Sequence, residues 1–470
     1  MIRVTMATIK YDKNHLTELL LRSWSLTETK MSSLAEHFDW VQRLNDETKV
    51  VLKRTSLSEC GDWYYDVDVG EIRNSRGTFF KITGVRESLN GKTHTEQPII
   101  LQQEIGFLGF LCKEIDGELY FLVQAKIEPG NVNKIQLSPT IQATRSNFEQ
   151  KHGGRQPQYL EYFVNANDDS VLYDQIQSEQ SSRFYGKRNR NIIVITQEDI
   201  QISERFRFMT LGQLKALMEV DNLVNMDART VISCLPYDAQ IVSNWPSIFT
   251  DKAFYNSLAN SNESELKRVI RLLNDKKMYS NRTKALVKLN SLKEWHLDDF
   301  KVYGVNKAFK VGFFEIEIEG REVTRWHQPL FEAIGMATLG LFTTVIGEER
   351  KFLVKLTEEV GCFDEVELGP TIQMEPNHHF DRSNAVELLF ERLYKAGDQI
   401  SHNVILSEEG GRFYHEQNRN VIIDVDTKYL SMLEIPENYI WVSFQTLNQL
   451  VKFNNILNLQ LRNLLSLLRI

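Results

Sequence analysis

The chain has 470 residues, 42% of them hydrophobic and 25% charged, which is too long for one hydrophobic core and predicts two or three soluble domains. Its 55 Lys and Arg against 63 Asp and Glu give a formal net charge of -8, which argues against a nucleic acid or an anionic membrane as the main partner. No apolar run reaches the ~18 residues that span a bilayer, and the N-terminus lacks the apolar segment of a signal peptide. We therefore expect a cytoplasmic protein.

Cysteine spacing gives no sign of a metal site or a disulfide framework. The four cysteines, Cys60, Cys112, Cys234 and Cys362, lie far apart and form no CxxC pair. The sequence also has no HExxH motif and no His/Asp cluster at the spacing of metal ligands. We expect four reduced, buried thiols and no bound metal.

The first segment with a clear pattern, residues 14–54, is predicted to be helical. Its apolar residues recur every three or four positions, from Leu16 to Trp24 and again from Leu34 to Leu44. Residues 63–123 instead alternate short apolar runs with turns. Asp116-Gly117, between two such runs, predicts a β-hairpin.

A polar stretch follows the predicted strands. Residues 136–147 contain two Gln, two Ser, two Thr, one Arg and one Asn. Such a segment either lies on the surface or lines a pocket whose ligand satisfies its polar groups. Further along, residues 210–235 are predicted to form one or two amphipathic helices, with Thr210 as an N-cap.

Much of this pattern occurs a second time. Several motifs recur 231 residues later, and one recurs 229 residues later, in the same order. The matched positions are Pro98 and Pro329, Gly109 and Gly340, Pro139 and Pro370, and, at the shorter offset, Arg183 and Arg412. A nearly constant offset through separate motifs indicates a duplicated domain.

The duplication divides the chain into four parts. We expect an N-terminal helical arm at residues 1–55, a first repeat at 56–245, a helical connection at 246–285 and a second repeat at 286–470. Strands followed by a helix in each repeat predict an α+β fold. Two equal units in one chain are expected to pack about a pseudo-twofold axis.

Positions that differ between the copies indicate where the chemistry lies, because a duplicated scaffold allows one copy to lose its site. At an offset of 231, Lys126 is matched by Thr357, and Arg145 is matched by Pro376. Glu128 keeps its counterpart, Glu359. We infer that the first repeat carries the chemistry and that the second supports it or holds a degenerate ligand site.

Lys126 and Glu128 are the strongest candidates for acid–base chemistry. They lie two residues apart at the end of a predicted strand, which places both side chains on one face. Such a pair can supply an acid and a base, although it can equally be a surface ion pair. Tyr159 and Tyr162 are the alternatives for proton transfer, and aromatic residues of this kind also fill cores.

A group of cations in this acidic chain suits a diphosphate, because arginine presents a bidentate fork to phosphate oxygens. The group consists of Arg145, Arg183, Lys187, Arg188 and Arg190. The alternative is a solvated charged loop. GxGxxG and GxxxxGK[ST] motifs are absent, so neither a nicotinamide cofactor nor a P-loop nucleotide is expected.

Four long motifs in order resemble those of the NDP-hexose 2,3-dehydratases of deoxysugar biosynthesis. They span residues 124–131, 136–147, 159–163 and 177–191, and the resemblance extends over nearly the whole chain. It implies a homodimer with two tandem Nudix-like repeats per chain, acting without a redox cofactor on a dTDP-linked 4-keto-6-deoxy-hexose. The chain lacks the REUxEExGU metal box, so the Nudix likeness concerns the fold only.

The reaction implied by the resemblance removes water across C2 and C3 of the sugar. The C4 ketone acidifies the C3 hydrogen, a base removes it, the enolate expels the C2 hydroxyl, and the enol rearranges to a 3,4-diketo-2,6-dideoxy sugar. We expect Glu128 to act as base or acid and Lys126 as donor to the oxyanion or leaving group, with Tyr159 or Tyr162 as the alternative. The expected substrate-binding residues are Gln124, Thr140, Gln142, Arg145, Asn147, Arg183, Tyr185, Arg188 and Asn191.

Three other functions remain open from the sequence. The chain could be a sugar-nucleotide epimerase or isomerase, which shares the proton abstraction but returns the proton. It could be a non-catalytic sugar-nucleotide binding module, or a Nudix-type hydrolase that releases a sugar phosphate.

Overall fold

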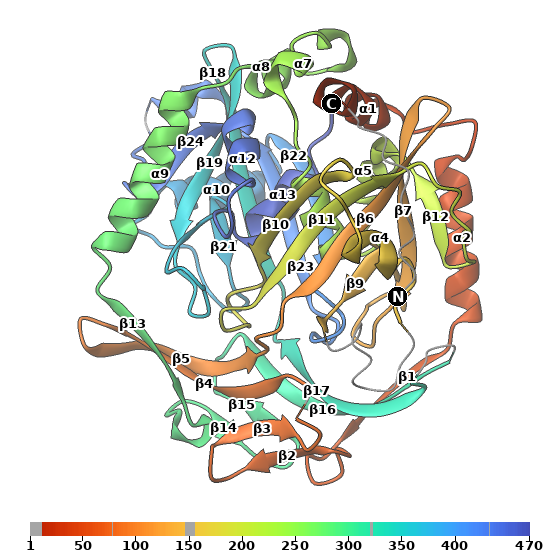
Figure 1. The fold of residues 1–470 in the computed structure, drawn as a ribbon. Helices are drawn as coiled ribbons and strands as arrows, with labels where there is room; N and C mark the ends of the chain where they lie inside the picture. The colour runs from red at the N-terminus through yellow and green to blue at the C-terminus, as the bar shows by residue number, and fades with distance from the viewer. Residues whose placement is uncertain (1–11, 78, 146–155, 320–322, 432) are drawn as a thin grey trace.

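The computed structural model describes residues 12–77, 79–145, 156–319, 323–431 and 433–470. Corresponding elements follow one another in the same order in the two halves of the chain. Each half contributes one large sheet and most of one small sheet (Figure 1). The α+β class and the duplication expected from the sequence are therefore confirmed.

The large sheet of the first repeat has seven strands. They are β6 (Gly106–Ile115), β7 (Glu118–Ile127), β8 (Ile135–Ser138), β9 (Ile141–Ala143), β10 (Val171–Ser178), β11 (Arg188–Thr196) and β12 (Phe206–Met209). The order is β10-β11-β6-β7-β12, with β8 paired to β7 and β9 paired to β6. The β6–β7 hairpin turns at Asp116 and Gly117, both with positive φ, as the sequence predicts.

The second repeat builds the same sheet. Its strands are β18 (Ala337–Ile346), β19 (Glu349–Thr357), β20 (Glu367–Gly369), β21 (Ile372–Met374), β22 (Ile400–Ser407), β23 (Gln417–Asp424) and β24 (Tyr439–Ser443). The order β22-β23-β18-β19-β24, with β20 on β19 and β21 on β18, matches that of the first sheet strand for strand. In both sheets the central pair, β11–β6 or β23–β18, is parallel.

The two small sheets exchange strands between the repeats. The first contains β2 (Trp63–Asp66), β3 (Glu71–Asn74), β4 (Lys81–Leu89), β5 (Lys92–Leu101) and also β13 (Arg282–Val287); the second contains β14 (His296–Leu297), β15 (Lys301–Tyr303), β16 (Phe309–Ile318), β17 (Arg325–Ala333) and also β1 (Val50–Thr55). β1 precedes the first repeat but pairs with β16 of the second. β13 precedes the second repeat but pairs with β4 of the first. Each repeat thus gives its leading strand to the other.

Most helices also correspond between the halves. The first half has α1 (Lys13–Ser25), α2 (Leu34–Glu47), α4 (Leu160–Val164), α5 (Leu211–Leu217), α6 (Met226–Ser233) and α7 (Ala239–Val242); the second has α8 (Lys252–Ala259), α9 (Glu263–Met278), α10 (Ala385–Ala396), α11 (Thr427–Leu430), α12 (Phe444–Leu450) and α13 (Leu459–Ser466). Ser23 of α1 accepts from the first N–H of α5, and Ser257 of α8 accepts from the first N–H of α12. α1 and α8 are therefore equivalent elements.

Two local predictions have different outcomes. Thr210 caps α5 in a capping box with Gln213, as expected. The helical prediction for residues 14–54 is correct for α1 and α2 but wrong for residues 50–54, which belong to β1. Val50 and Val51 are β-branched, and pairing with β16 stabilises them in a strand.

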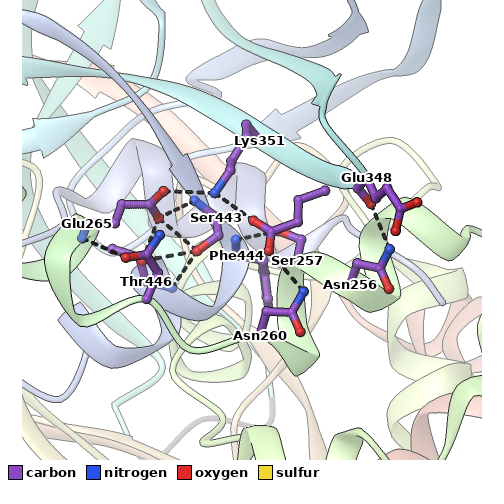
Figure 2. Close-up of polar contacts among 11 residues, drawn as sticks. Asn256, Ser257, Asn260, Glu265, Glu348, Lys351, Ser443, Phe444 and Thr446 are labelled. Atoms are coloured by element: carbon purple, nitrogen blue, oxygen red, sulfur yellow. Dashed lines mark hydrogen bonds and ion pairs between the residues drawn. The ribbon is translucent and has the colours of Figure 1, made fainter.

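A charged network fixes α9 to the second repeat (Figure 2). Glu265 of α9 accepts hydrogen bonds from the N–H of Ser443, at the N-cap of α12, and from the hydroxyl of Thr446. Its second oxygen lies 2.8 Å from Lys351 Nζ on β19. One carboxylate thus joins three elements.

Contacts between the repeats are reciprocal. The buried indole of Trp63 donates to the carbonyl of His327, and that of Trp295 donates to the carbonyl of Glu96. Arg229 of α6 donates to Ser407 O, while Arg462 of α13 donates to Ser178 O. Such pairwise exchange is what an approximate twofold relation between the repeats produces.

Two further expectations concern the whole chain. All four cysteines are buried and unpaired, as the sequence predicts. Among the helices of the described residues, none combines the length and the apolar character required to cross a membrane.

Candidate active site

The polar residues at the end of β7 form a compact cluster, which we call the β7 site and define as Lys126, Glu128 and Gln142. Lys126 Nζ lies 3.4 Å from Glu128 Oε1 and donates to the carbonyl of Gln142 at 3.3 Å. The Gln142 amide donates to Glu128 Oε1 at 2.9 Å. The side chains of Lys126 and Glu128 are only 15% and 6% exposed, so they are not a surface ion pair.

The strands explain why these residues meet. Lys126 is the penultimate residue of β7, and Glu128 follows the strand directly. Gln142 lies on β9, which pairs with the neighbouring strand β6 opposite Leu108. The two-residue spacing therefore places Lys126 and Glu128 on one face, as predicted.

Asn225, the N-cap of α6, orients Gln142. Its amide nitrogen donates to Gln142 Oε1 at 3.1 Å, while its own oxygen caps the helix at the N–H of Ala228. Because Gln142 Oε1 is occupied as an acceptor, its NH₂ group must face Glu128. Asn225 was not predicted from the sequence, although its counterpart Asn458 lies at the equivalent position of the second repeat.

The second repeat contains the same framework, which we call the β19 site and define as Thr357, Glu359 and Gln373. Gln373 donates to Glu359 Oε1 at 2.9 Å, and Asn458 donates to Gln373 Oε1 at 2.9 Å. Burial, together with the nearby Glu375, raises the pKa of Glu359 to about 7. The two sites therefore have equivalent hydrogen bonds around the glutamate, but the β19 site has Thr357 where the β7 site has Lys126.

Each site also receives a loop from the other repeat. The N–H of Gly130 donates to Gly410 O, and the N–H of His415 donates to Gly130 O. Reciprocally, the N–H of Gly361 donates to Ser181 O. Residues 409–415, between β22 and β23, thus lie against the β7 site, and residues 180–186 lie against the β19 site.

This exchange changes which arginine accompanies which site. Arg183, expected beside Lys126, forms a bidentate pair with Glu375 at 3.2 and 2.6 Å and stacks on Phe309. Its counterpart Arg412 donates to Gln102 Oε1 and stacks on Phe80. Arg412 lies in the loop against the β7 site, where sequence reasoning placed Arg183. The sequence did contain a signal for the position of Arg412: the arginine is repeated, and a pseudo-twofold relation between the repeats was expected.

Tyr159 and Tyr162 are not part of the β7 site. Both are buried in a cluster with Phe206 and other apolar residues. The Tyr159 hydroxyl donates to Gln201 O at 2.8 Å, and burial with the nearby Glu198 raises the pKa of Tyr162 to about 12. Their hydroxyl groups are directed toward residues 198–203.

Three of the predicted binding residues form hydrogen bonds within the protein, and the equivalent residues of the second repeat form the same bonds. Thr140 accepts from Leu111 N and donates to Leu122 O, as Thr371 does with Phe342 and Leu353. Asn191 donates to Asn189 O, as Asn420 does to Asn418 O. Tyr185 is held through its backbone by Ile100. These features support the scaffold in both repeats.

The remaining predicted residues are dispersed. Gln124 accepts from Ser138 on the neighbouring strand β8. Arg188 stacks on Phe363, Arg190 pairs with Asp174, and Lys187 donates to Glu104 O. Arg145 is exposed. Asn147 lies outside the described residues.

Metal ligation finds no support within the described parts of the chain. They contain no group of three or more His, Cys, Asp or Glu arranged to hold a metal ion. The chemistry that the β7 site itself offers is proton transfer and hydrogen bonding to a developing oxyanion.

A duplicated α+β scaffold in which one copy holds a buried Lys–Glu pair defines a class of tandem-repeat proteins equipped for acid–base chemistry. The chain matches the family profile described as NDP-hexose 2,3-dehydratase over residues 34–235 and 266–468. It belongs to the NDP-hexose 2,3-dehydratase family, which confirms the resemblance and the expectation of a carbon–oxygen lyase.

Three relatives match over most of their length, and each is described as a dTDP-4-dehydro-6-deoxy-alpha-D-glucopyranose 2,3-dehydratase. The one from Streptomyces violaceoruber is 34% identical over 447 residues, covering 94% of this chain and 98% of the relative. The one from Saccharopolyspora spinosa is 34% identical, covering 93% and 91%. The one from Amycolatopsis orientalis is 32% identical over 437 residues, covering 91% and 88%.

Proposed function

We propose that this chain removes water across C2 and C3 of dTDP-4-keto-6-deoxy-glucose to give the 3,4-diketo-2,6-dideoxy sugar of deoxysugar biosynthesis. The observation that carries the proposal is the ammonium of Lys126, 3.4 Å from the Glu128 carboxylate, at a position where the other repeat has Thr357. The relatives named for this substrate support it.

The β7 site suits each step of the elimination. The C4 ketone makes the C3 hydrogen acidic, and Glu128, whose carboxylate lies 3.4 Å from the Lys126 ammonium, can accept that proton. Negative charge then develops on the C4 oxygen, where the Lys126 ammonium stabilises it. Gln142 holds Glu128 in place through its 2.9 Å hydrogen bond.

Arg412 is the cation that we propose for the substrate diphosphate near the β7 site. Arg183 already shares its fork with the Glu375 carboxylate, and Thr144 occupies the position equivalent to Glu375 in the first repeat. The side chain of Arg412 donates to two neutral acceptors, the Gln102 amide oxygen and the Gly411 carbonyl, and stacks on the ring of Phe80. Arg145 and Asn147, expected from the sequence to bind substrate, belong to the same proposal.

The family resemblance supports several finer proposals. We propose Nudix-like repeats at residues 56–245 and 286–470, a helical arm and a helical connection before them, a homodimer, a cytoplasmic location and catalysis without a redox cofactor. Light scattering coupled to size-exclusion chromatography tests the dimer, because a single chain has a mass of 54.7 kDa.

Incubation with dTDP-4-keto-6-deoxy-glucose tests the proposed function. Mass spectrometry should show a product lighter than the substrate by one water, and added nicotinamide cofactor should not change the rate. An unchanged mass with an altered sugar stereocentre would instead establish an epimerase or isomerase.

Two further outcomes would replace the proposal with other functions. Binding of dTDP-sugar without turnover would establish a binding module. Release of a sugar phosphate with Mg²⁺ would establish a Nudix-type hydrolase. Each outcome is distinct from loss of water.

A further inference from the structure

A carboxylate from the second repeat stands beside the β7 site. Glu409 begins the loop whose next residue, Gly410, accepts a hydrogen bond from the N–H of Gly130 at 2.7 Å. A Cβ on Gly410 would lie 2.2 Å from Asn131 Oδ1. The backbone that follows Glu128 is therefore in direct contact with the backbone that follows Glu409. Glu409 itself keeps partial solvent exposure, as a side chain that reaches a substrate requires.

The two sites differ in their ionisable groups as well as in the lysine. Glu409 is matched by Gln180, at the 229-residue offset, and Asp227 of α6 is matched by Gln460 of α13. Gln180 and Gln460 line a cavity of about 10 Å³ together with Gln373 of the β19 site. From the reciprocity of the repeats we expect Glu409 and Asp227 to lie near Gln142, and Asp227 interacts electrostatically with both Glu409 and Glu128. The β7 site thus has carboxyl groups where the β19 site has amides.

The loop is built to hold the Glu409 carboxylate. The N–H of Gly411 donates to Glu409 Oε1 at 3.0 Å. A Cβ on Gly411 would lie 2.2 Å from the same oxygen, so any other residue at 411 displaces the carboxylate. The equivalent residue beside Gln180 is Ser182, which shows that the loop tolerates a side chain where no carboxylate has to be held.

Electrostatics favour a protonated Glu409. Burial, and next the negative charge of Glu128, raise the pKa of Glu409, against the opposing effect of Arg412 and Lys126. Asp227, buried beside Glu409 and Glu128, also has a raised pKa, chiefly because of burial. Glu179 and Lys187 also interact electrostatically with Glu409. The raised pKa favours the protonated form of Glu409, which can donate a proton.

We propose that Glu409, supplied by the second repeat, is the catalytic acid that protonates the departing C2 hydroxyl at the β7 site. The proposal rests on the dehydratase function proposed above and divides its two proton transfers between two residues. Glu128 is the base at C3.

The step is balanced in atoms and charge. Glu128 takes the proton from C3, and the electrons of that bond form the C3=C4 double bond of the enolate. The C4 carbonyl then re-forms, the C2=C3 double bond forms, and the C2–O bond breaks as Glu409 donates its proton, releasing water. The enol then becomes the ketone: its O–H proton passes to Glu409, and Glu128 returns its proton to C2. Both residues are restored, and no further reactant is needed.

Glu409→Gln in the full-length chain tests the proposal. Water loss from dTDP-4-keto-6-deoxy-glucose should slow about 100-fold or more, the usual effect of removing a general acid, with KM nearly unchanged. In D₂O the variant should still exchange the C3 hydrogen of the substrate, because Glu128 remains. Glu128→Gln should lose both exchange and water loss. Glu409→Asp should recover part of the rate.

Gly411→Ser provides a second test that leaves Glu409 in the sequence. It should slow water loss by displacing the carboxylate, while the matched control Ser182→Gly in the other loop should retain wild-type activity. Circular dichroism and dTDP binding verify that each variant is folded.

The outcomes distinguish this inference from the proposed function. Wild-type rates in Glu409→Gln, or equal loss of exchange and water loss, would overturn the role of Glu409 while leaving the dehydratase in place. A wild-type chain that releases no water would overturn the proposed function itself and this inference with it.

Discussion

Lys126 is the side chain that distinguishes two otherwise equivalent hydrogen-bond frameworks. Glu128 and Gln142 have the same contacts as Glu359 and Gln373. An amide and a carboxylate alone can hold a sugar hydroxyl, but a cation is needed to stabilise an enolate strongly in a buried site. At the residue scale, the ammonium is therefore, in the mechanism that we propose, one of the groups, together with Glu409, that separate a reactive copy from a scaffold copy.

Lys126→Thr, which installs the residue of the second repeat, should lower kcat about 100-fold to 1,000-fold, the range seen when one oxyanion donor is removed. The reason is loss of charge stabilisation at the C4 oxygen. Steady-state kinetics of water loss measures the effect. Lys355→Met, on the equivalent strand β19, removes a lysine that pairs with Glu387 and should leave kcat within about twofold.

How far the site could be predicted from the sequence depends on distance along the chain. Lys126 and Glu128 could be predicted because strand geometry fixes the relation of residues two apart. Arg183 was assigned to the wrong neighbourhood because the loop that carries it crosses to the other repeat. Glu409 and Arg412 could not be predicted without that crossing, since their neighbours lie more than half the chain away.

At the element scale, glycines permit the contact between the loops. A Cβ on Gly130 would lie 1.6 Å from Phe413 O, and a Cβ on Gly361 would lie 1.9 Å from Phe184 O. The two positions are equivalent, and in both the backbones of opposite repeats touch. The sequence showed these glycines in both copies, but only the fold reveals what approaches them.

Gly130→Ala should destabilise the protein by about 3 kcal/mol, because overpacking at a rigid backbone contact cannot relax. Chemical denaturation measures the change. Gly347→Ala is the control: its φ is +65° and nothing lies within 4 Å of the added Cβ, so the cost should be only ~1 kcal/mol of backbone strain. Equal losses in both variants would contradict the close-contact explanation.

The network around Glu265 makes the attachment of α9 dependent on pH. Hydrogen bonds from Lys351, Ser443 and Thr446 lower the pKa of Glu265 below its ordinary 4.5, although burial opposes them. A depressed pKa in the folded state means that the stabilisation is complete above pH 4.5 and is lost as the pH falls through the folded value.

Glu265→Gln should therefore cost about 2 kcal/mol at pH 7, as expected for removing a charged hydrogen-bond partner, and progressively less below pH 4. Thermal unfolding of both proteins, measured at several values from roughly pH 3 to roughly pH 8, gives the difference in stability. A stability difference that does not change with pH would show that the charge of Glu265 is not responsible.

Element types were predictable where the local pattern is strong. Thr210 and Gln213 form the capping box that their spacing predicts. Residues 50–54 were misassigned because their strand conformation depends on pairing with β16, which lies far away in the sequence. Local propensity does not contain that information.

At the scale of the whole molecule, the strand exchange joins the halves more tightly than a linker would. β1 completes the small sheet of the second repeat, and β13 completes that of the first. Arg229 and Arg462 also cross between the repeats. The repeats visible in the sequence are therefore not independent folding units.

Fragments 1–244 and 245–470 should each fail to fold alone but should form a complex when coexpressed, because each contains a strand that the other needs. Copurification through a tag on one fragment, followed by circular dichroism and the dehydration assay, measures the outcome. A fragment that unfolds cooperatively by itself would contradict the dependence.

The exchange of β1 and β13 also makes each copy depend on the other. A single repeat on its own would have one unpaired strand and one unpaired sheet edge. Two copies pair both when each adds its strand to the sheet of the other. Because both copies lie in one chain, they stay interlocked while their side chains differ. One copy can therefore lack the lysine and still supply a carboxyl group to the other.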